Sequence, residues 1–229
     1  MQDIPNRDNL TRADSTASAQ TLQKWGGLAS FLLAASFITA PMIYLFGNLR
    51  DTFGPFSYSV ADFLYGPVWA ASLVTAVFAL RERLLEHAPR RVSLALLAAL
   101  LAAGLMLTVA CIRAANRHYH LIHPELHLEN NTAVLIVWAT LVASISAAGW
   151  HFLGWTLVLL GSAGWTSGRL PRLLCALYLL GGVVSLFVYL FPNLEEPAAT
   201  LGLVWGVWQG IVMLRSRAEG QPAIVTSQT

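Results

Sequence analysis

The sequence predicts an all-α, polytopic membrane protein in which six transmembrane helices form one bundle. Asp, Glu, Lys and Arg make up only 11% of the 229 residues, whereas an average soluble domain contains roughly 25%. The apolar residues gather into six blocks that together hold a single charged residue, Asp62. Each block approaches the roughly 20 helical residues that cross a bilayer core, and a helix satisfies its backbone hydrogen bonds internally. The blocks are 25–46, 60–80, 92–112, 134–165, 173–191 and 198–214.

The first block follows a polar segment, 1–24, whose few apolar residues predict a disordered cytoplasmic tail. Because block 25–46 is longer than the apolar region of a signal peptide and its leader is acidic, we expect it to remain as the first spanning helix. Blocks 60–80 and 92–112 each fit one crossing. Between them, residues 81–91 alternate positive and negative side chains at helical spacing, which predicts a solvated helix extension. Attraction to lipid phosphates is the alternative.

The fourth block, 134–165, is too long for one perpendicular helix and too short for two ordinary ones. With six helices, 11 of the 14 Lys and Arg residues lie on the side of the N-terminus, whereas with seven helices each side holds 7. The positive-inside rule therefore predicts one long fourth helix, six spans and cytoplasmic termini. The polar residues Asn130, Asn131 and Thr132 are predicted to cap this helix.

A short turn containing a glycine and a proline separates the fourth and fifth blocks. Gly168 can adopt the positive φ that ends a helix, and Pro171 suits the first turn of the next one. Trp165, Arg169 and Arg172 are predicted to anchor this hairpin at the cytoplasmic interface. Binding to a lipid headgroup or docking of a protein are the alternatives for these residues.

Three glycines recur every four residues in the sixth block, at Gly202, Gly206 and Gly210. This small-xxx-small pattern predicts a face on which another helix packs closely. The polar residues 216–229 predict a flexible cytoplasmic tail. Residues 25–215 are therefore expected to form one six-helix transmembrane domain.

The second half of the chain, 133–215, resembles a family of small six-helix bacterial membrane proteins that is defined only as a domain of unknown function. The resemblance rests on a long fourth helix that ends in the turn Ser-Gly-Arg-Leu-Pro-Arg at 167–172, a Leu- and Gly-rich fifth helix and a closing sixth helix. The first half is similar only in general architecture. The resemblance implies a fold and a membrane, and it carries no activity.

His151 is the sharpest candidate for a functional residue inside the predicted spans, because ionisable side chains are rare there. Ser144 and Trp155 share its helical face by their spacing. A neutral histidine that is hydrogen-bonded across helices to a hydroxyl or to Gln209 would account for this pattern. The alternatives are a proton relay or substrate contact, and a haem or metal ligand.

Asp62 lies near the outer end of the second predicted helix. An acidic side chain is favourable at the start of a helix, so the sequence allows either a helix-start carboxylate or an acid that binds ions at a pore mouth. If Asp62 and His151 meet in the bundle, their proton affinities are coupled and the pair becomes an intramembrane site.

Four of the six histidines lie in one loop that is predicted to face the outer side. Imidazole and carboxylate side chains suit zinc, copper or nickel, so a divalent-metal site is one hypothesis for this loop. A polar interfacial loop and a pH-sensing loop are the others. The four histidines are His118, His120, His123 and His127.

The leading functional hypothesis is a non-enzymatic integral membrane protein of the bacterial plasma membrane. No cofactor is predicted, although a haem or a divalent metal remains an alternative through the histidines. The net charge of +2 comes from anchoring arginines and gives no indication of nucleic-acid binding. The expected partners are the lipid bilayer and either another membrane protein or a second copy of the chain.

Three alternative functions make different predictions about the bundle. A small transporter that uses His151 and Asp62 requires a polar cavity that reaches His151. A haem or metal protein, or an intramembrane enzyme, requires several polar groups that converge on one point. An accessory subunit of a membrane complex predicts a dry core, dispersed polar residues and an apolar flank.

Overall fold

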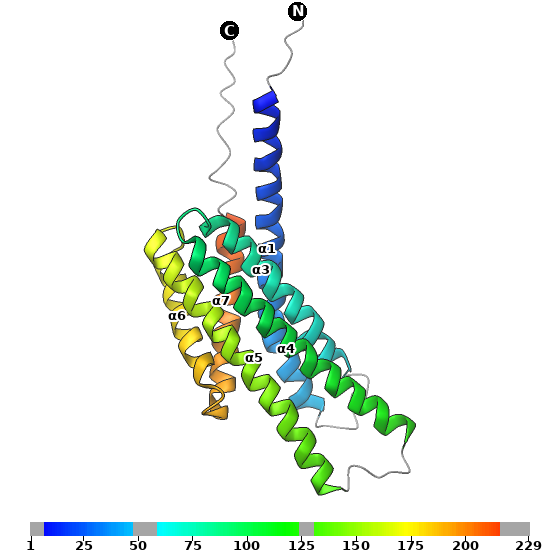
Figure 1. Ribbon diagram of the computed structural model, residues 1–229. Helices are drawn as coiled ribbons and strands as arrows, with labels where there is room; N and C mark the ends of the chain where they lie inside the picture. The colour runs from blue at the N-terminus through cyan, green and yellow to red at the C-terminus, as the bar shows by residue number, and fades with distance from the viewer. Residues whose placement is uncertain (1–6, 48–58, 124–130, 216–229) are drawn as a thin grey trace, which may run out of the picture.

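The computed structural model describes residues 7–47, 59–123 and 131–215, and the regular structure in these ranges is entirely helical (Figure 1). The all-α prediction is therefore confirmed. The elements are α1 (Arg7–Gly47), the π-helical turn η1 (Leu64–Val68), α3 (Trp69–Leu84), α4 (Pro89–Ile122), α5 (Thr132–Ser167), α6 (Arg172–Phe187), the 3-10 turn η4 (Pro192–Leu194) and α7 (Glu195–Arg215).

Four helical stretches among the described residues are long and apolar enough to cross a membrane. They are Ser59–Leu84, which contains η1 and α3, then Pro89–Tyr119 in α4, then α5, and finally Pro192–Arg215, which contains η4 and α7. Helix α6 is apolar but has only 16 residues. Because α5 runs without a break from Thr132 to Ser167, the fourth apolar block forms one helix rather than two.

Single residues that were predicted from the sequence define the two ends of α5. Asn131 is the N-cap, and its side-chain oxygen accepts a hydrogen bond from the backbone N–H of Val134 at 3.3 Å. Gly168 ends the helix with a φ of +64°, a left-handed conformation that costs a glycine little. Pro171 then stands at the N-cap of α6. The predicted helix–turn–helix between the fourth and fifth blocks is thus confirmed.

The N-terminal segment differs from its prediction as a disordered tail, because α1 already begins at Arg7. Residues 7–24 are helical and extend α1 beyond the other helices (Figure 1). A helix that has nucleated in the following apolar block gains one backbone hydrogen bond for each residue added, and no glycine or proline interrupts 7–24. The predicted C-terminal tail, 216–229, lies outside the described residues.

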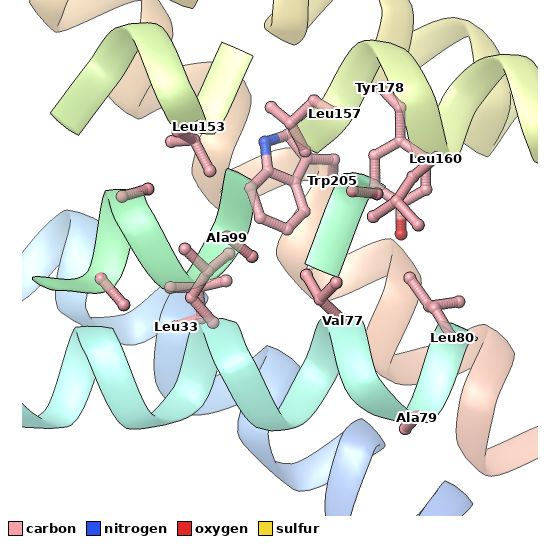
Figure 2. Packing of buried hydrophobic residues seen from close by; sticks show 14 of the residues in the cluster. Leu33, Val77, Ala79, Leu80, Ala99, Leu153, Leu157, Leu160, Tyr178 and Trp205 are labelled. Atoms are coloured by element: carbon pink, nitrogen blue, oxygen red, sulfur yellow. The ribbon is translucent and has the colours of Figure 1, made fainter. Parts of the chain in front are cut away.

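The six long helices form a closed ring. Each helix packs against its neighbours in chain order, α1 on α3, α3 on α4, α4 on α5, α5 on α6 and α6 on α7, and α7 returns to pack on α1. Side chains from every helix fill the middle of this ring. Figure 2 shows six of them, one from each helix: Leu33, Val77, Ala99, Leu157, Tyr178 and Trp205.

Glycines allow two of these helix pairs to approach closely. On α5, a Cβ atom added to Gly154 would lie 2.8 Å from the carbonyl oxygen of Gly182 on α6. On α7, the predicted glycine face packs on α1, with Gly202 against the ring of Phe37 and Gly206 against Ala34. The prediction that the sixth block contacts another helix through its glycines is therefore confirmed.

The first ten residues of α5, 132–141, extend past the part of the helix that α6 covers; we call them the α5 extension. All of them are exposed except the half-buried Trp138. Apolar side chains point out in several directions, and Ile136 and Val137 are 60% and 69% exposed. The indole nitrogen of Trp138 is buried, so the exposed surface of the α5 extension is formed by its other residues.

Candidate functional site

His151 lies on α5 and links that helix to α6. Its Nδ1 atom is 3.3 Å from the carbonyl oxygen of Leu186, and the indole N–H of Trp155 donates to its Nε2 atom at 3.1 Å. The ring of Tyr189 packs edge-on against the imidazole, with the ring centroids 5.5 Å apart.

These two hydrogen bonds define the tautomer of His151. A carbonyl oxygen can only accept and an indole N–H can only donate, so the proton of His151 sits on Nδ1 and Nε2 is the acceptor. A second proton on Nε2 would displace the N–H of Trp155. His151 thus bridges two helices, and its partners are Leu186 and Trp155 rather than Gln209.

Gln209 belongs to a different polar group, which is buried between α1, α6 and α7. The hydroxyl of Tyr178 donates to Oε1 of Gln209 at 2.7 Å, and the amide nitrogen of Gln209 lies 3.8 Å from the sulfur of Met213. Ser30 donates to the carbonyl oxygen of Gly26 at 2.6 Å, and its hydroxyl lies 3.9 Å from the same sulfur. The members of this group hold three helices together within the core.

Asp62 is buried just before η1 and is paired with α4. Its carboxylate forms an ion pair with Arg117, and its Oδ1 atom lies 4.0 Å from Nη1 of Arg113. These two arginines are one helical turn apart. Asp62 therefore ties the start of the second apolar block to the far end of α4, a role that sequence reasoning missed. The only available signal was the i, i+4 spacing of the arginines.

The four polar candidates from the sequence occupy separate places. His151 bridges α5 and α6, Gln209 bridges α6 and α7, and Asp62 pairs with α4. Ser144 is exposed and donates within its own helix, to the carbonyl oxygen of Thr140 at 2.7 Å. Each candidate engages its own set of partners, so these contacts assemble no single site.

The prediction of one loop that holds all four histidines is wrong in part, because His118 and His120 lie in α4 and His123 is the C-cap of that helix. His118 is exposed, and His123 packs against the ring of Tyr119 with the centroids 4.7 Å apart. The side chain of His120 and the whole of His127 lie outside the described residues. Within the described ranges, His, Cys, Asp and Glu side chains form no group of three or more that could hold a metal ion.

The centre of the ring is aromatic, a feature that sequence reasoning did not identify. The ring of Phe37 contacts three indoles with centroids 6.0 to 6.3 Å apart. The indole N–H of Trp150 reaches the start of α7, where it donates to Glu195 at 3.2 Å. Tryptophan suits both a membrane interface and a core, and only the fold assigns these to the core. The three indoles are those of Trp69, Trp150 and Trp205.

The predicted interface anchors Trp165, Arg169 and Arg172 are exposed at the α5–α6 turn. Arg169 also reaches the α3–α4 turn, where its Nε atom donates to Nε2 of His87 at 3.4 Å. The anchors therefore contact a second turn, which spacing along the sequence could not reveal.

No protein-family model matches this chain, and neither the curated proteins nor the solved structures contain a match. The function is therefore inferred from the geometry described above.

Proposed function

We propose that this protein is a non-catalytic, multi-pass membrane protein that acts as an accessory subunit, and that it presents the α5 extension to another membrane protein. The observation that carries the proposal is the combination of a ring filled with apolar side chains and polar candidates that are each bonded elsewhere. We also propose that it lies in a bacterial plasma membrane with six spans and cytoplasmic termini, as the arginine asymmetry and the resemblance at 167–172 favour.

The packed ring argues against a transporter. A transport path through the middle would need polar side chains or water along the bundle axis, whereas this axis is filled by residues such as Leu157, Trp205 and Phe37. His151 and Asp62, the two side chains that the transporter hypothesis needs, interact with different helices.

The length of α5 argues for a protein partner. Its 36 residues measure about 54 Å at about 1.5 Å per residue. Even at a tilt of about 40°, the upper end of the usual range, such a helix spans about 41 Å along the membrane normal, and the hydrocarbon core is about 30 Å thick. With Ser167 at the cytoplasmic interface, roughly ten residues at the other end leave the hydrocarbon core.

Those ten residues are the α5 extension, and eight of them are apolar. Beyond the hydrocarbon core, exposed side chains such as Val134, Ile136 and Val137 contact headgroups or water, which is unfavourable for them. A contiguous exposed apolar patch is typical of a protein interface. We therefore assign this segment to the contact with a partner subunit.

Site-specific photo-crosslinking in native membranes tests this assignment. A photoreactive residue at Ile136 or Val137 is expected to capture one discrete protein partner, and Ile136→Ser/Val137→Ser is expected to abolish co-purification of that partner. The matched control position is Leu97 on α4, which is also apolar and 54% exposed but lies within the predicted span, so it should capture only lipid. Capture of lipid alone from all three positions would refute the accessory role, and capture of a second copy would replace it with self-association.

A further inference from the structure

Two turns that are far apart in the sequence meet at one end of the bundle. Nη2 of Arg83, at the end of α3, donates to the backbone carbonyl of Arg169 at 3.1 Å. The guanidinium of Arg169 in turn contacts Nε2 of His87, with Nε at 3.4 Å and Nη2 at 3.3 Å. The α3–α4 turn and the α5–α6 turn are thus joined by their own arginines.

A third arginine crosses between α4 and α5 at the same end. Nη1 of Arg91 donates to the hydroxyl of Thr166 at 3.1 Å and lies 3.4 Å from the carbonyl oxygen of Ser162. We call the arginines of the two turns and of the adjoining helix ends the arginine cluster. Its members are Arg81, Arg83, Arg90, Arg91, Arg169 and Arg172.

The arginine cluster has a large excess of positive charge. The segments 81–91 and 166–172, which comprise the two turns and the adjoining helix ends, contain six arginines but only two acidic residues. One of these, Glu82, is already paired with Arg81 at 2.6 Å. His87 accepts a hydrogen bond from Arg169. These segments thus hold four more arginines than acidic residues.

Two helix N-termini add to the positive potential. α4 begins at Pro89 and α6 at Arg172, and neither has a side-chain cap or an acidic residue in its first turn. The first backbone N–H groups of a helix lack intrahelical partners and favour a negative charge. Most helix starts supply that charge or a capping oxygen from the chain itself, and these two do not.

The surface beside the arginine cluster is apolar. Trp165 and Leu173, which flank the α5–α6 turn, are 52% and 58% exposed. A soluble phosphate would make no favourable contact with these apolar side chains, whereas the acyl chains of a phospholipid would cover them. Arginine is well suited to the phosphate itself, because its planar fork binds two phosphate oxygens at once.

We propose that the arginine cluster is a binding site for the phosphate of an anionic phospholipid in the adjacent leaflet. The two uncapped helix N-termini add attraction for the headgroup, and Trp165 and Leu173 contact the acyl chains. The site joins the α3–α4 and α5–α6 turns, so a bound lipid should also stabilise the fold.

The test measures lipid binding by native mass spectrometry and thermal stability of the full chain in neutral detergent. Phosphatidylglycerol is expected to bind at least tenfold more tightly than phosphatidylcholine with the same acyl chains, and to raise Tm by several degrees. Raising the salt concentration should weaken this preference, because exposed charges are screened. Inorganic phosphate at the same concentration should leave Tm unchanged.

Two variants locate the site. Arg169→Gln/Arg172→Gln, in which both side chains are exposed, should fold normally and lose the preference for phosphatidylglycerol. Arg215→Gln, which removes an exposed arginine at the end of α7, should keep it. Equal binding of the two lipids, an unchanged preference in the double variant, or an equal loss in Arg215→Gln would overturn the proposal. A Tm shift with inorganic phosphate as large as that with lipid would assign the cluster to a free anion instead.

Discussion

Tyr178 and Gln209 form a buried hydrogen-bonded pair whose contribution to stability can be measured. The phenol donates to the amide at 2.7 Å within the core. Tyr178→Phe leaves Oε1 of Gln209 without its donor, which should lower the free energy of unfolding by about 1–3 kcal/mol. The double variant Tyr178→Phe/Gln209→Leu should recover part of this loss, because both polar partners are gone. A double-mutant cycle in mixed micelles measures the coupling, and strictly additive losses would show that the bond contributes nothing.

Two glycines on facing parts of the core should respond in opposite ways to the same substitution. Gly154→Ala places a methyl group 2.8 Å from the carbonyl oxygen of Gly182, so it should destabilise the protein by about 1–3 kcal/mol through overpacking. Gly181→Ala places its methyl group 3.5 Å from Trp205, an ordinary contact, and should be neutral or stabilising because alanine favours helix. Thermal denaturation in detergent compares the two, and equal losses would contradict the close packing of α5 on α6.

His151 has a structural role as a bridge between α5 and α6. His151→Phe keeps an aromatic ring but removes the bonds to Leu186 and Trp155, and should cost about 1 kcal/mol of stability. The crosslink from Val137 to the partner should persist in this variant. Loss of the crosslink without loss of stability would show that His151 acts in function rather than in packing.

Among the helices, Asp62 should stabilise the packing of η1 on α4 through its ion pair with Arg117. Asp62→Asn leaves Arg117 without its carboxylate, and we expect a loss of about 1–3 kcal/mol. This expected loss is smaller than the loss for a fully buried ion pair, because Arg117 is partly exposed. Combining it with Arg117→Gln should restore part of the stability, as measured by chemical denaturation. If the double variant is as unstable as the sum of the two single variants, the ion pair is not what ties η1 to α4.

The helices themselves were largely predictable, and their exceptions have physical reasons. Asn131 and Gly168 mark the ends of α5 because their chemistry is local to the backbone. The π-helical turn η1 around Pro67 was not predicted, since the second apolar block shows no irregular period. The start of α1 at Arg7 was also not predicted. Amino-acid composition indicates how much apolar surface a segment can bury, whereas a helix can extend into a polar segment from an apolar segment that is already helical.

Across the whole bundle, the apolar blocks of the sequence predict where helices form, but they do not predict which helices pack against each other. The order of helices around the ring determines which residues meet. It brings Phe37 against Trp69, Trp150 and Trp205, and it gives His151 and Asp62 different partners. The same order brings Arg83 to Arg169. Composition and periodicity do not indicate which distant residues are in contact. The structure was therefore needed to show which of the candidate site residues lie together.

Apolar side chains fill the middle of the ring, and the accessibility of a cysteine placed there tests whether water can enter it. Ala99→Cys places a small thiol at a fully buried position in the ring, in a Cys111→Ser background that removes the exposed native thiol. The native Cys175, which is also buried, serves as an internal control. A membrane-impermeant thiol reagent applied to both sides of native membranes should modify neither cysteine until the protein is denatured. Rapid modification of Cys at position 99 in the folded protein would reveal an aqueous path through the bundle and contradict this account in favour of a transporter.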